Sequence, residues 1–233
     1  MTVELWWVAT RDVVDDEVVR ACSALLTPEE RIKQSAFRFE KNRHEYLVTR
    51  ALGRAVLARR LGVAPSALAF TRNEYGKPEL DPPALRFNLT NTVDLVACVV
   101  AGGVEVGVDA EPLSRGGQVL DVATTVFTEA ERAALAALPL PEREQRAVRL
   151  WTSKEAYMKA RGMGMSLPVE KIELDLDVPG GRLRFFDPLT DAPSRWTITT
   201  REIDGHLVAT CIEGGGEVTI WRADLRALLG VAG

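Results

Sequence analysis

Two carboxylates end an apolar segment in the middle of the chain, in the sequence Val104-Glu105-Val106-Gly107-Val108-Asp109-Ala110-Glu111-Pro112. Because side chains alternate along an extended strand, Asp109 and Glu111 would project from one face, about 7 Å apart along the backbone. Mg²⁺ suits such a pair, because it takes oxygen ligands and fills its remaining positions with water and substrate phosphates. An ordinary pair of surface acids is the alternative interpretation of the same residues.

A second pair of charges lies in the segment Leu150-Trp151-Thr152-Ser153-Lys154-Glu155-Ala156-Tyr157-Met158-Lys159. In a helix, Glu155 and Lys159 share one face, whereas Lys154 points about 100° away from Glu155. As a plain surface ion pair they would contribute only about 0.3 kcal/mol. Trp151 and Tyr157 add bulk that indicates a partly buried helix, and a charged pair in such a helix is a candidate for chemistry.

Residues that suit anions come earlier in the chain. The turn Tyr75-Gly76-Lys77-Pro78 holds a lysine between glycine and proline, and the strand-like segment 86–92 ends in Thr90-Asn91-Thr92. Hydroxyl, amide and backbone N–H groups there offer donors to an anion. Between Arg31 and Arg60, nine basic residues accompany only two acidic ones. This segment is either a phosphate-binding surface or a solvated helix face whose long side chains cover apolar neighbours.

Apolar periodicity and capping signals predict the elements that would position these residues. Long helices are expected at 41–61 and 142–161, each followed by a glycine, and shorter ones at 15–26 and 223–229. Thr27-Pro28-Glu29-Glu30 and Thr128-Glu129-Ala130-Glu131 predict two further helix starts with capping boxes. Strands are expected at 3–9, 68–72, 86–89, 95–100, 104–109, 172–176, 183–186, 196–200, 207–212 and 217–221.

The two halves of the chain follow the same order, a long helix that ends at glycine and then several strands. The strand Leu95-Val96-Ala97-Cys98-Val99 in the first half is similar to Leu207-Val208-Ala209-Thr210-Cys211 in the second. An internal duplication would give two α+β lobes with a ligand cleft between them. Chance similarity of two apolar strands is the alternative.

Composition limits the class of protein. The 233 residues hold 29 Lys and Arg against 33 Asp and Glu, a formal net charge of −4, and 46% of them are apolar. There is neither an apolar stretch of the roughly 18 residues that a membrane helix needs nor the pattern of a secretory signal, and net acidity argues against a long nucleic-acid surface. We therefore expect a cytoplasmic protein with neither a membrane nor a nucleic acid as partner. Three separated cysteines, Cys22, Cys98 and Cys211, indicate buried reduced thiols, and the presence of only two histidines argues against a histidine-based metal site.

Taken together, these segments resemble a known family. Gly107-Val108-Asp109-x-Glu111 and Trp151-x-x-Lys154-Glu155-Ala156-x-x-Lys159, whose acids Asp109 and Glu155 lie 155 − 109 = 46 positions apart, resemble the paired signature of 4'-phosphopantetheinyl transferases. The Gly76-Lys77-Pro78 turn and the Phe87-Asn88-Leu89-Thr90 strand resemble the double-lobed type that activates surfactin synthetase. The resemblance runs from about Thr27 to Leu167. It implies a monomeric α+β pseudo-dimer of two similar lobes with the active-site cleft between them. Residues 1–104 would form the N-terminal lobe on the nucleotide side, and residues 105–233 would form the C-terminal lobe with the metal and the catalytic helix.

The resemblance implies a Mg²⁺-dependent enzyme, with Mn²⁺ as an alternative metal. The enzyme would transfer the phosphopantetheine arm of coenzyme A to a serine hydroxyl of an apo acyl or peptidyl carrier protein and release adenosine 3',5'-bisphosphate. Such carriers serve fatty-acid, polyketide or nonribosomal-peptide synthesis. Asp109, Glu111 and Glu155 would bind the metal, Glu155 would be the general base, directly or through a metal-bound water, and Lys159 would stabilise charge on the phosphate bridge. The residues implied to contact coenzyme A are Lys33, Lys41, Arg72, Lys77, Thr90, Asn91, Asp109 and Lys159.

Two residues depart from the family pattern. Asn91 stands where the family often has His, so an amide replaces a charge-assisted phosphate contact, and Glu30 stands where some members have Lys. The Asn91 difference leaves open a non-catalytic protein that binds coenzyme A. The same metal cleft also leaves open an enzyme that acts on another nucleotide.

Overall fold

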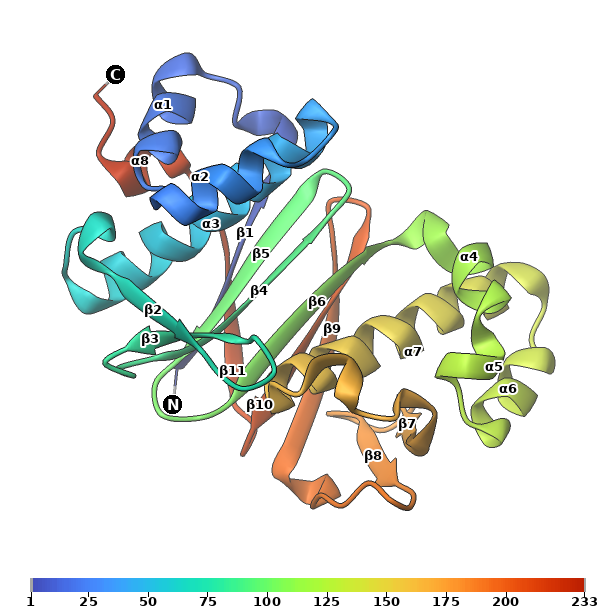
Figure 1. Cartoon of the computed structure of the whole chain (residues 1–233). Helices are drawn as coiled ribbons and strands as arrows, with labels where there is room; N and C mark the ends of the chain where they lie inside the picture. Colours follow the sequence, from blue (N-terminus) through green and yellow to red (C-terminus); the bar gives the residue numbers. More distant parts are fainter. Residues whose placement is uncertain (1, 233) are drawn as a thin grey trace.

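The computed structural model describes residues 2–232 as two lobes of helices and strands that lie side by side (Figure 1). The strands are β1 (Thr2–Ala9), β2 (Ala69–Arg72), β3 (Pro78–Asp81), β4 (Arg86–Thr92), β5 (Leu95–Ala101), β6 (Val106–Pro112), β7 (Ile172–Asp175), β8 (Arg182–Phe185), β9 (Trp196–Ile203), β10 (His206–Glu213) and β11 (Glu217–Arg222). The first lobe contains a four-stranded sheet in the order β11-β1-β5-β4, and the second contains a three-stranded sheet in the order β6-β10-β9. The hairpins β2-β3 and β7-β8 complete the two lobes. This arrangement confirms the predicted α+β fold.

One long helix lies on the outer face of each sheet, and the shorter helices lie around it (Figure 1). The helices are α1 (Asp16–Ala24), α2 (Pro28–Ser35), α3 (Glu40–Leu61), α4 (Gly116–Asp121), α5 (Ala123–Val126), α6 (Glu129–Ala136), α7 (Leu140–Arg161) and α8 (Leu225–Leu229). Every element predicted from the sequence is present within a few residues at each end. The sequence reading missed β3, α4 and α5, because β3 begins with proline, α4 begins with two glycines and α5 is only four residues long.

The two lobes repeat one pattern. Helices α3 and α7 are each 22 residues long, and each ends at a glycine with φ of 68°, Gly62 in the first lobe and Gly162 in the second. A left-handed residue at this position ends a helix without the steric penalty of a Cβ atom. The helix before each long helix starts with a capping box, at Thr27 for α2 and at Thr128 for α6.

The glutamate of each capping box also binds a cation on the long helix of its own lobe. Glu30 Oε2 accepts a hydrogen bond from Arg54 Nη2 at 3.2 Å, and Glu131 Oε2 accepts one from Lys154 Nζ at 2.6 Å. The partners are separated by 24 residues in the first lobe and by 23 in the second. Equivalent residues therefore make equivalent contacts, which confirms the predicted pair of similar lobes.

Helix α7 lies directly on strand β6 because position 107 carries no side chain. A Cβ atom on Gly107 would lie 2.1 Å from the carbonyl oxygen of Ala156 and 2.4 Å from the nitrogen of Ala160. On the side of the first lobe, Asn88 Oδ1 in β4 accepts a hydrogen bond from Val108 N at 3.0 Å. Strand β6 is thus held between the catalytic-helix candidate α7 and the first lobe.

Buried apolar side chains form one core under α3, another under α7 and a third between the two sheets. Cys22 and Cys98 lie in the core under α3, and Cys211 lies in the core under α7. All three cysteines are free and buried, as expected from the sequence.

The end of the chain returns to the first lobe. Strand β11 pairs in parallel with β1, from Thr2 opposite Glu217 to Trp7 opposite Arg222, and α8 packs on α1 and α3. The expected division into residues 1–104 and 105–233 stays a prediction, and the segment 217–229 lies with the elements of the first lobe. Within residues 2–232, no helix is long and apolar enough to cross a membrane.

Candidate active site

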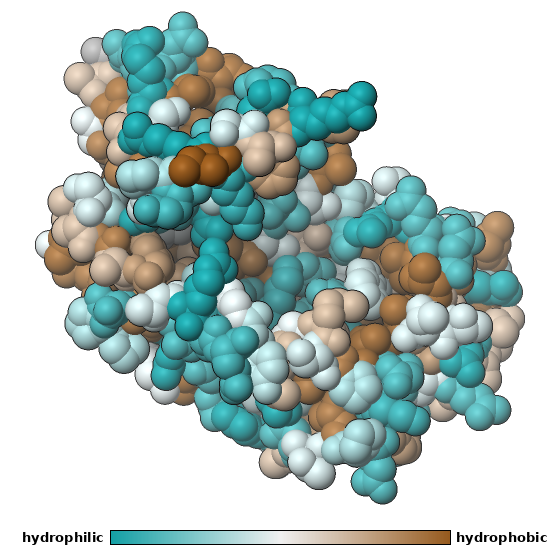
Figure 2. All heavy atoms as spheres, viewed as in Figure 1, coloured by the Kyte–Doolittle hydropathy of each residue, from teal (hydrophilic) through white to brown (hydrophobic). Residues whose placement is uncertain are grey.

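Three residues from distant segments meet where β4, β6 and α7 come together. Lys159 Nζ lies 2.6 Å from Asp109 Oδ1 and donates to Thr90 Oγ1 at 3.0 Å. Thr90 Oγ1 in turn donates to the same Asp109 oxygen at 3.1 Å. The contact joins the two lobes, since Thr90 belongs to the first and the other two to the second. Figure 2 shows hydrophilic side chains gathered in the hollow between the lobes.

Two carboxylate oxygens at this junction lack a hydrogen-bond partner. Asp109 Oδ2 and Glu111 Oε2 are both buried and unpaired, whereas Glu111 Oε1 accepts from Trp151 Nε1 at 3.3 Å and from Arg115. Unpaired buried acceptors are uncommon in proteins and call for a donor or a cation. Within residues 2–232, no group of three His, Cys, Asp or Glu side chains is arranged to hold a metal ion by itself. The donor set nevertheless fits a hard cation that takes its remaining ligands from water and phosphate.

Glu155 lies one helical turn before Lys159, and the charges of this cluster shift its pKa. Burial raises the pKa of Glu155 to about 7, and the negative charges of Asp109 and Glu111 add to this rise. The positive charges of Lys159 and Arg115 act in the opposite direction. A carboxyl group with a pKa near neutrality is well matched to taking up a proton at physiological pH.

The predicted lysine of the Gly76-Lys77-Pro78 turn is held between the lobes. Lys77 Nζ lies 3.0 Å from Glu105 Oε2 and donates to the carbonyl oxygen of Ala160 at 3.0 Å. Asn73 Nδ2, from the same turn, donates to the carbonyl oxygen of Gly162 at 2.9 Å. This turn therefore fixes the end of α7 against the first lobe, and a contact between Lys77 and a nucleotide stays a prediction.

The other predicted basic and polar residues lie on the surface of the first lobe. Lys33 Nζ lies 5.8 Å from the centre of the Tyr46 ring, and Lys41 Nζ lies 3.3 Å from Asp94 Oδ1. Arg72 Nη1 donates to the carbonyl oxygen of Gly76 at 2.8 Å. Asn91 is exposed near the end of β4. Their positions are compatible with a ligand on this face, and their roles stay predictions.

Comparison with known proteins covers both lobes. Residues 105–211 match the family model described as "4'-phosphopantetheinyl transferase superfamily", and residues 13–102 match "4'-phosphopantetheinyl transferase, N-terminal". The chain is 30% identical over 193 residues to 4'-phosphopantetheinyl transferase Sfp of Bacillus subtilis, which covers 81% of this chain and 82% of that protein. This chain belongs to the 4'-phosphopantetheinyl transferase superfamily.

A second curated relative supports the same assignment. The transferase is 32% identical over 158 residues to 4'-phosphopantetheinyl transferase HetI of a Nostoc species, with 66% of each chain covered. Among solved structures, a holo-(acyl-carrier-protein) synthase from Bacillus anthracis superposes on 47% of this chain and 96% of its own, with 22% identity and a TM-score of 0.38. The expectation of an enzyme of the phosphopantetheinyl transferase class is confirmed by the named relatives.

One charged residue of the transferase signature is structural in this chain. Lys154 is fully buried, and its Nζ donates to Glu131 Oε2 at 2.6 Å and to the carbonyl oxygen of Val126 at 2.8 Å. Burial lowers the pKa of Lys154, and the charge of Glu131 opposes that shift. Lys154 therefore stabilises the packing of α6 against α7 and does not face the Asp109 cluster.

Arg115 was missed from the sequence, although it contacts Glu111. Arg115 lies four residues after Glu111. This spacing predicts a side-chain contact only within a helix, and Glu111 lies in a strand. Trp151 was noted for its bulk, but its indole N–H proves to be a donor to Glu111. Both contacts occupy one oxygen of Glu111 and leave the other unpaired.

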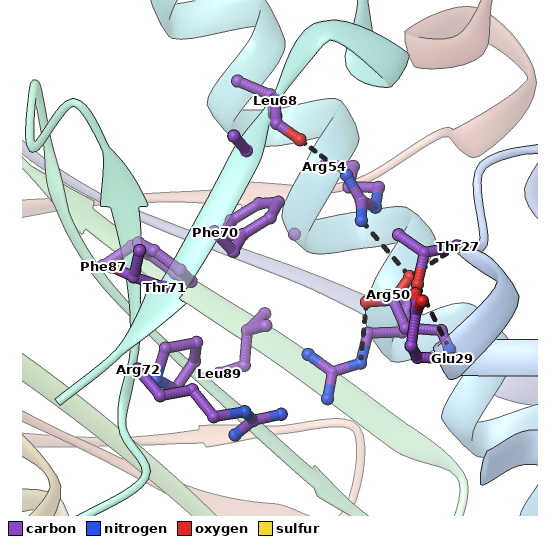
Figure 3. Close-up of a pocket in the computed structure, with 14 residues that line it drawn as sticks. Thr27, Glu29, Arg50, Arg54, Leu68, Phe70, Thr71, Arg72, Phe87 and Leu89 are labelled. Atoms are coloured by element: carbon purple, nitrogen blue, oxygen red, sulfur yellow. Dashed lines mark hydrogen bonds and ion pairs between the residues drawn. The ribbon is translucent and has the colours of Figure 1, made fainter. Parts of the chain in front are cut away.

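A separate pocket of about 330 Å³ opens in the first lobe of the transferase (Figure 3). It lies between α3 and the β2-β3 hairpin, over Leu89 of β4. Its charged lining residues are three arginines and two glutamates, namely Arg50, Arg54, Arg72, Glu29 and Glu30. Cations therefore exceed anions by one in the wall of this pocket.

Proposed function

We propose that this transferase moves the 4'-phosphopantetheine arm of coenzyme A onto a serine hydroxyl of an apo acyl or peptidyl carrier-protein domain. The observation that carries the proposal is the contact of Lys159 with both Asp109 and Thr90, one helical turn from Glu155. These residues provide a cation for phosphate and an acid with a pKa near neutrality on one face of α7. Membership of the family supplies the class of reaction.

The carrier serine would attack the phosphorus atom that bears the pantetheine arm. A bond forms between the serine oxygen and phosphorus, the bond from that phosphorus to the bridging oxygen breaks, and adenosine 3',5'-bisphosphate leaves. Glu155 would accept the serine proton, because a hydroxyl is a weak nucleophile until that proton is removed. Lys159 would stabilise the negative charge that develops on the bridging oxygen and the leaving phosphate.

We propose Mg²⁺ as the metal of this site, with Mn²⁺ as a substitute. Asp109, Glu111 and Glu155 would hold it, since two of these residues carry unpaired buried oxygens and all three offer the hard donors that it prefers. When bound, it would neutralise charge on the pyrophosphate and orient the reacting phosphoryl group.

The nucleotide of coenzyme A would lie against the first lobe. Thr90 would donate to phosphate beside Lys159, and Lys33, Lys41, Arg72, Lys77 and Asn91 would supply further contacts along the basic face. Charge-assisted contacts of Lys and Arg to phosphate are stronger than neutral hydrogen bonds, so this face would provide much of the affinity. Because both lobes belong to one chain, the enzyme would work as a monomer, and its setting would be the cytoplasm.

Loading of a carrier protein tests this function directly. The enzyme is incubated with coenzyme A, Mg²⁺ and a panel of apo-carrier domains, and each carrier is weighed by intact-mass spectrometry. The proposal is supported if carriers gain the mass of one phosphopantetheine with Mg²⁺, gain none when EDTA is present from the start, and gain it again when excess Mg²⁺ is added. Binding of coenzyme A without a mass gain on any carrier would instead favour a binding protein on the same scaffold.

A further inference from the structure

Two cavities adjoin each other on the second lobe, between α7 and β9. The larger has a volume of about 410 Å³ and the smaller of about 250 Å³, and both are lined by Arg149, Thr200 and Arg201. Arg149 lies six residues before Glu155, which is about 9 Å along the helix and about 240° around its axis. The two cavities therefore lie on a different side of α7 from the Asp109 cluster.

Arg149 has most of its guanidinium free. Its Nε donates to Thr200 Oγ1 at 3.2 Å, and this hydrogen bond joins the helix to the edge strand of the sheet. Its two terminal nitrogens have no acceptor among residues 2–232, and they stay open to solvent. Within the same residues Arg149 forms no ion pair, although its side chain is half-buried. A partly enclosed cation without a counterion is well placed to bind an anion.

The wall of the smaller cavity adds a second free cation and one acid that is already neutralised. Arg201 is exposed, forms no ion pair in the described part of the chain, and uses Nη1 to donate to the carbonyl oxygen of Thr200 at 2.9 Å. The acid is Asp177, whose two oxygens accept from Nη1 and Nη2 of Arg146 at 2.7 and 2.8 Å. Arg149 and Arg201 are therefore two cations next to one hydroxyl group, without a competing free carboxylate in this cavity.

The larger cavity extends the site with hydrogen-bond acceptors. Its wall adds Gln145 of α7 and two exposed glutamates, among them Glu202 of β9. Carboxylate and amide oxygens accept hydrogen bonds from hydroxyl groups, and the carboxylates repel a further anion. A ligand with an anionic group at Arg149 would therefore turn hydroxyl groups toward this side.

The first lobe shows that a cation at this position is not needed for the repeated packing of helix on sheet. Helix α3 starts at Glu40 and α7 at Leu140, and both have 22 residues, so Arg149 occupies the position of Thr49. Thr49 carries no charge, and its hydroxyl donates to the carbonyl oxygen of Glu45 in its own helix at 2.6 Å. The charge of Arg149 is thus an addition of the second lobe.

We propose that the second lobe binds a phosphate monoester of a small hydroxylated molecule at Arg149, apart from the site proposed for coenzyme A. A guanidinium fork matches two phosphate oxygens, and a monoester carries a charge of about −1.5 to −2 at neutral pH, which Arg149 and Arg201 balance. Thr200 would donate its hydroxyl hydrogen to the phosphate, while Gln145 and Glu202 would accept from the hydroxyl groups of the ligand. The competing role of Arg149 is only to join α7 to β9.

Titration with ribose 5-phosphate tests this site. Binding is followed by the backbone amide signals of Thr200 and Arg201 in two-dimensional NMR, with and without saturating coenzyme A. Ribose 5-phosphate should shift these signals equally in both cases and should bind more tightly than inorganic phosphate, which has no hydroxyl groups for the larger cavity. Ribose itself should shift nothing. In the Arg149→Gln variant, the affinity for ribose 5-phosphate should fall at least about tenfold, equivalent to about 1.4 kcal/mol.

Two further variants control for charge and for structure. Arg149→Lys should keep part of the affinity, because it keeps the charge. Arg184→Gln removes an exposed arginine of β8 that pairs with Glu173 outside both cavities, and it should bind ribose 5-phosphate as wild type does. Thermal melts establish that each variant is folded.

Three results would overturn the proposal. The first is the lack of any shift with millimolar ribose 5-phosphate, and the second is an unchanged affinity in a folded Arg149→Gln variant. The third is loss of the shift when coenzyme A is added, which would place the phosphate in the site proposed for coenzyme A. Equal affinities for inorganic phosphate and ribose 5-phosphate would contradict the contacts of Gln145 and Glu202 with hydroxyl groups. None of these results depends on whether the enzyme loads a carrier, so the proposed function is tested separately.

Discussion

Arg54 and Lys154 are equivalent residues in the two lobes, each a buried cation on the long helix that binds the capping-box glutamate of its own lobe. One residue further along, the helices differ, because α3 has Ala55 where α7 has Glu155. Both lobes therefore contain the ion pair between the long helix and the capping-box glutamate, but only the second lobe has an acidic side chain, Glu155, at the next position. Under the proposed function, this difference would give the duplicated fold a single site of reaction.

Lys154→Met should destabilise the protein strongly without altering the chemistry of the folded enzyme. Loss of the ammonium leaves the carboxylate of Glu131 buried without its cation, which costs about 3–5 kcal/mol. Denaturant unfolding measures the change. Adding Glu131→Gln should restore much of the stability, because no unpaired charge then remains. Unfolding of Lys154→Met at the wild-type midpoint would refute the structural role of this lysine.

The sequence alone could separate the two signature lysines only in part. Helical spacing showed that Lys154 points away from Glu155 and that Lys159 shares its face. It could not show that Lys154 meets Glu131, because that contact depends on how α6 packs against α7. The capping box formed by Thr128 and Glu131 was predictable from the sequence. The additional hydrogen bond of Glu131 with Lys154 was not.

The other features that the sequence could not predict are contacts between segments that lie far apart along the chain. Strands β4 and β6 were predictable from their patterns, although both extend about three residues beyond their predicted ends. The surroundings of the unpaired oxygen of Asp109 were not, because they depend on three segments that meet only in the fold. The parallel pairing of β11 with β1 joins the two ends of the chain, and no local pattern encodes it. Prediction thus succeeded for the local elements, and it failed for contacts between distant segments.

Glu155→Gln should remove the proton acceptor from the cluster and lower the rate of carrier loading by at least about 100-fold. The fold should be retained, since the amide has nearly the same shape and burial already disfavours the charged form of Glu155. Loading is followed by intact mass under saturating coenzyme A. Glu142→Gln, at an exposed position in the first turn of the same helix, is the control and should load carriers at the wild-type rate. Undiminished loading by Glu155→Gln would rule out its role as base.

Asp191 should stabilise the second lobe at neutral pH through its ionised form. Its Oδ2 accepts hydrogen bonds from Tyr157, Trp196 and Arg161 at 2.9, 2.7 and 2.6 Å. Burial acts to raise the pKa of Asp191, but these bonds outweigh it, and the pKa is lowered below its ordinary value of 3.8. The stabilisation is therefore present above pH 3.8 and is lost as the pH falls through the lower folded value.

Asp191→Asn should consequently be less stable than wild type by about 2 kcal/mol, as expected when hydrogen bonds to a buried charged group are weakened. The difference in unfolding free energy should be constant between pH 8 and pH 5 and should shrink only below about pH 4. Denaturant unfolding across this pH range measures it. A difference that disappears between pH 8 and pH 5 would contradict the assignment of the stabilising charge to Asp191.

Gly107→Ala should disrupt the proposed active site from a position packed between β6 and α7. The added Cβ atom would lie 2.1 Å from the backbone oxygen of Ala156, so α7 must move away from β6. That shift would separate Lys159 from Asp109, which now lie 2.6 Å apart across the same two elements. Loading activity should fall at least about 100-fold, because misplacement by about 1 Å is enough for such a loss.

Gly117→Ala provides the matched control for this substitution. Its Cβ atom would meet only the end of the Glu144 side chain, at 3.5 Å, so stability and loading should stay close to wild type. For Gly107→Ala, a lower melting temperature should accompany the loss of loading, since the clash is with backbone that cannot turn aside. A Gly107→Ala enzyme that loads carriers as fast as Gly117→Ala would show that the close contact of α7 with β6 is not needed to hold Lys159 and Asp109 together.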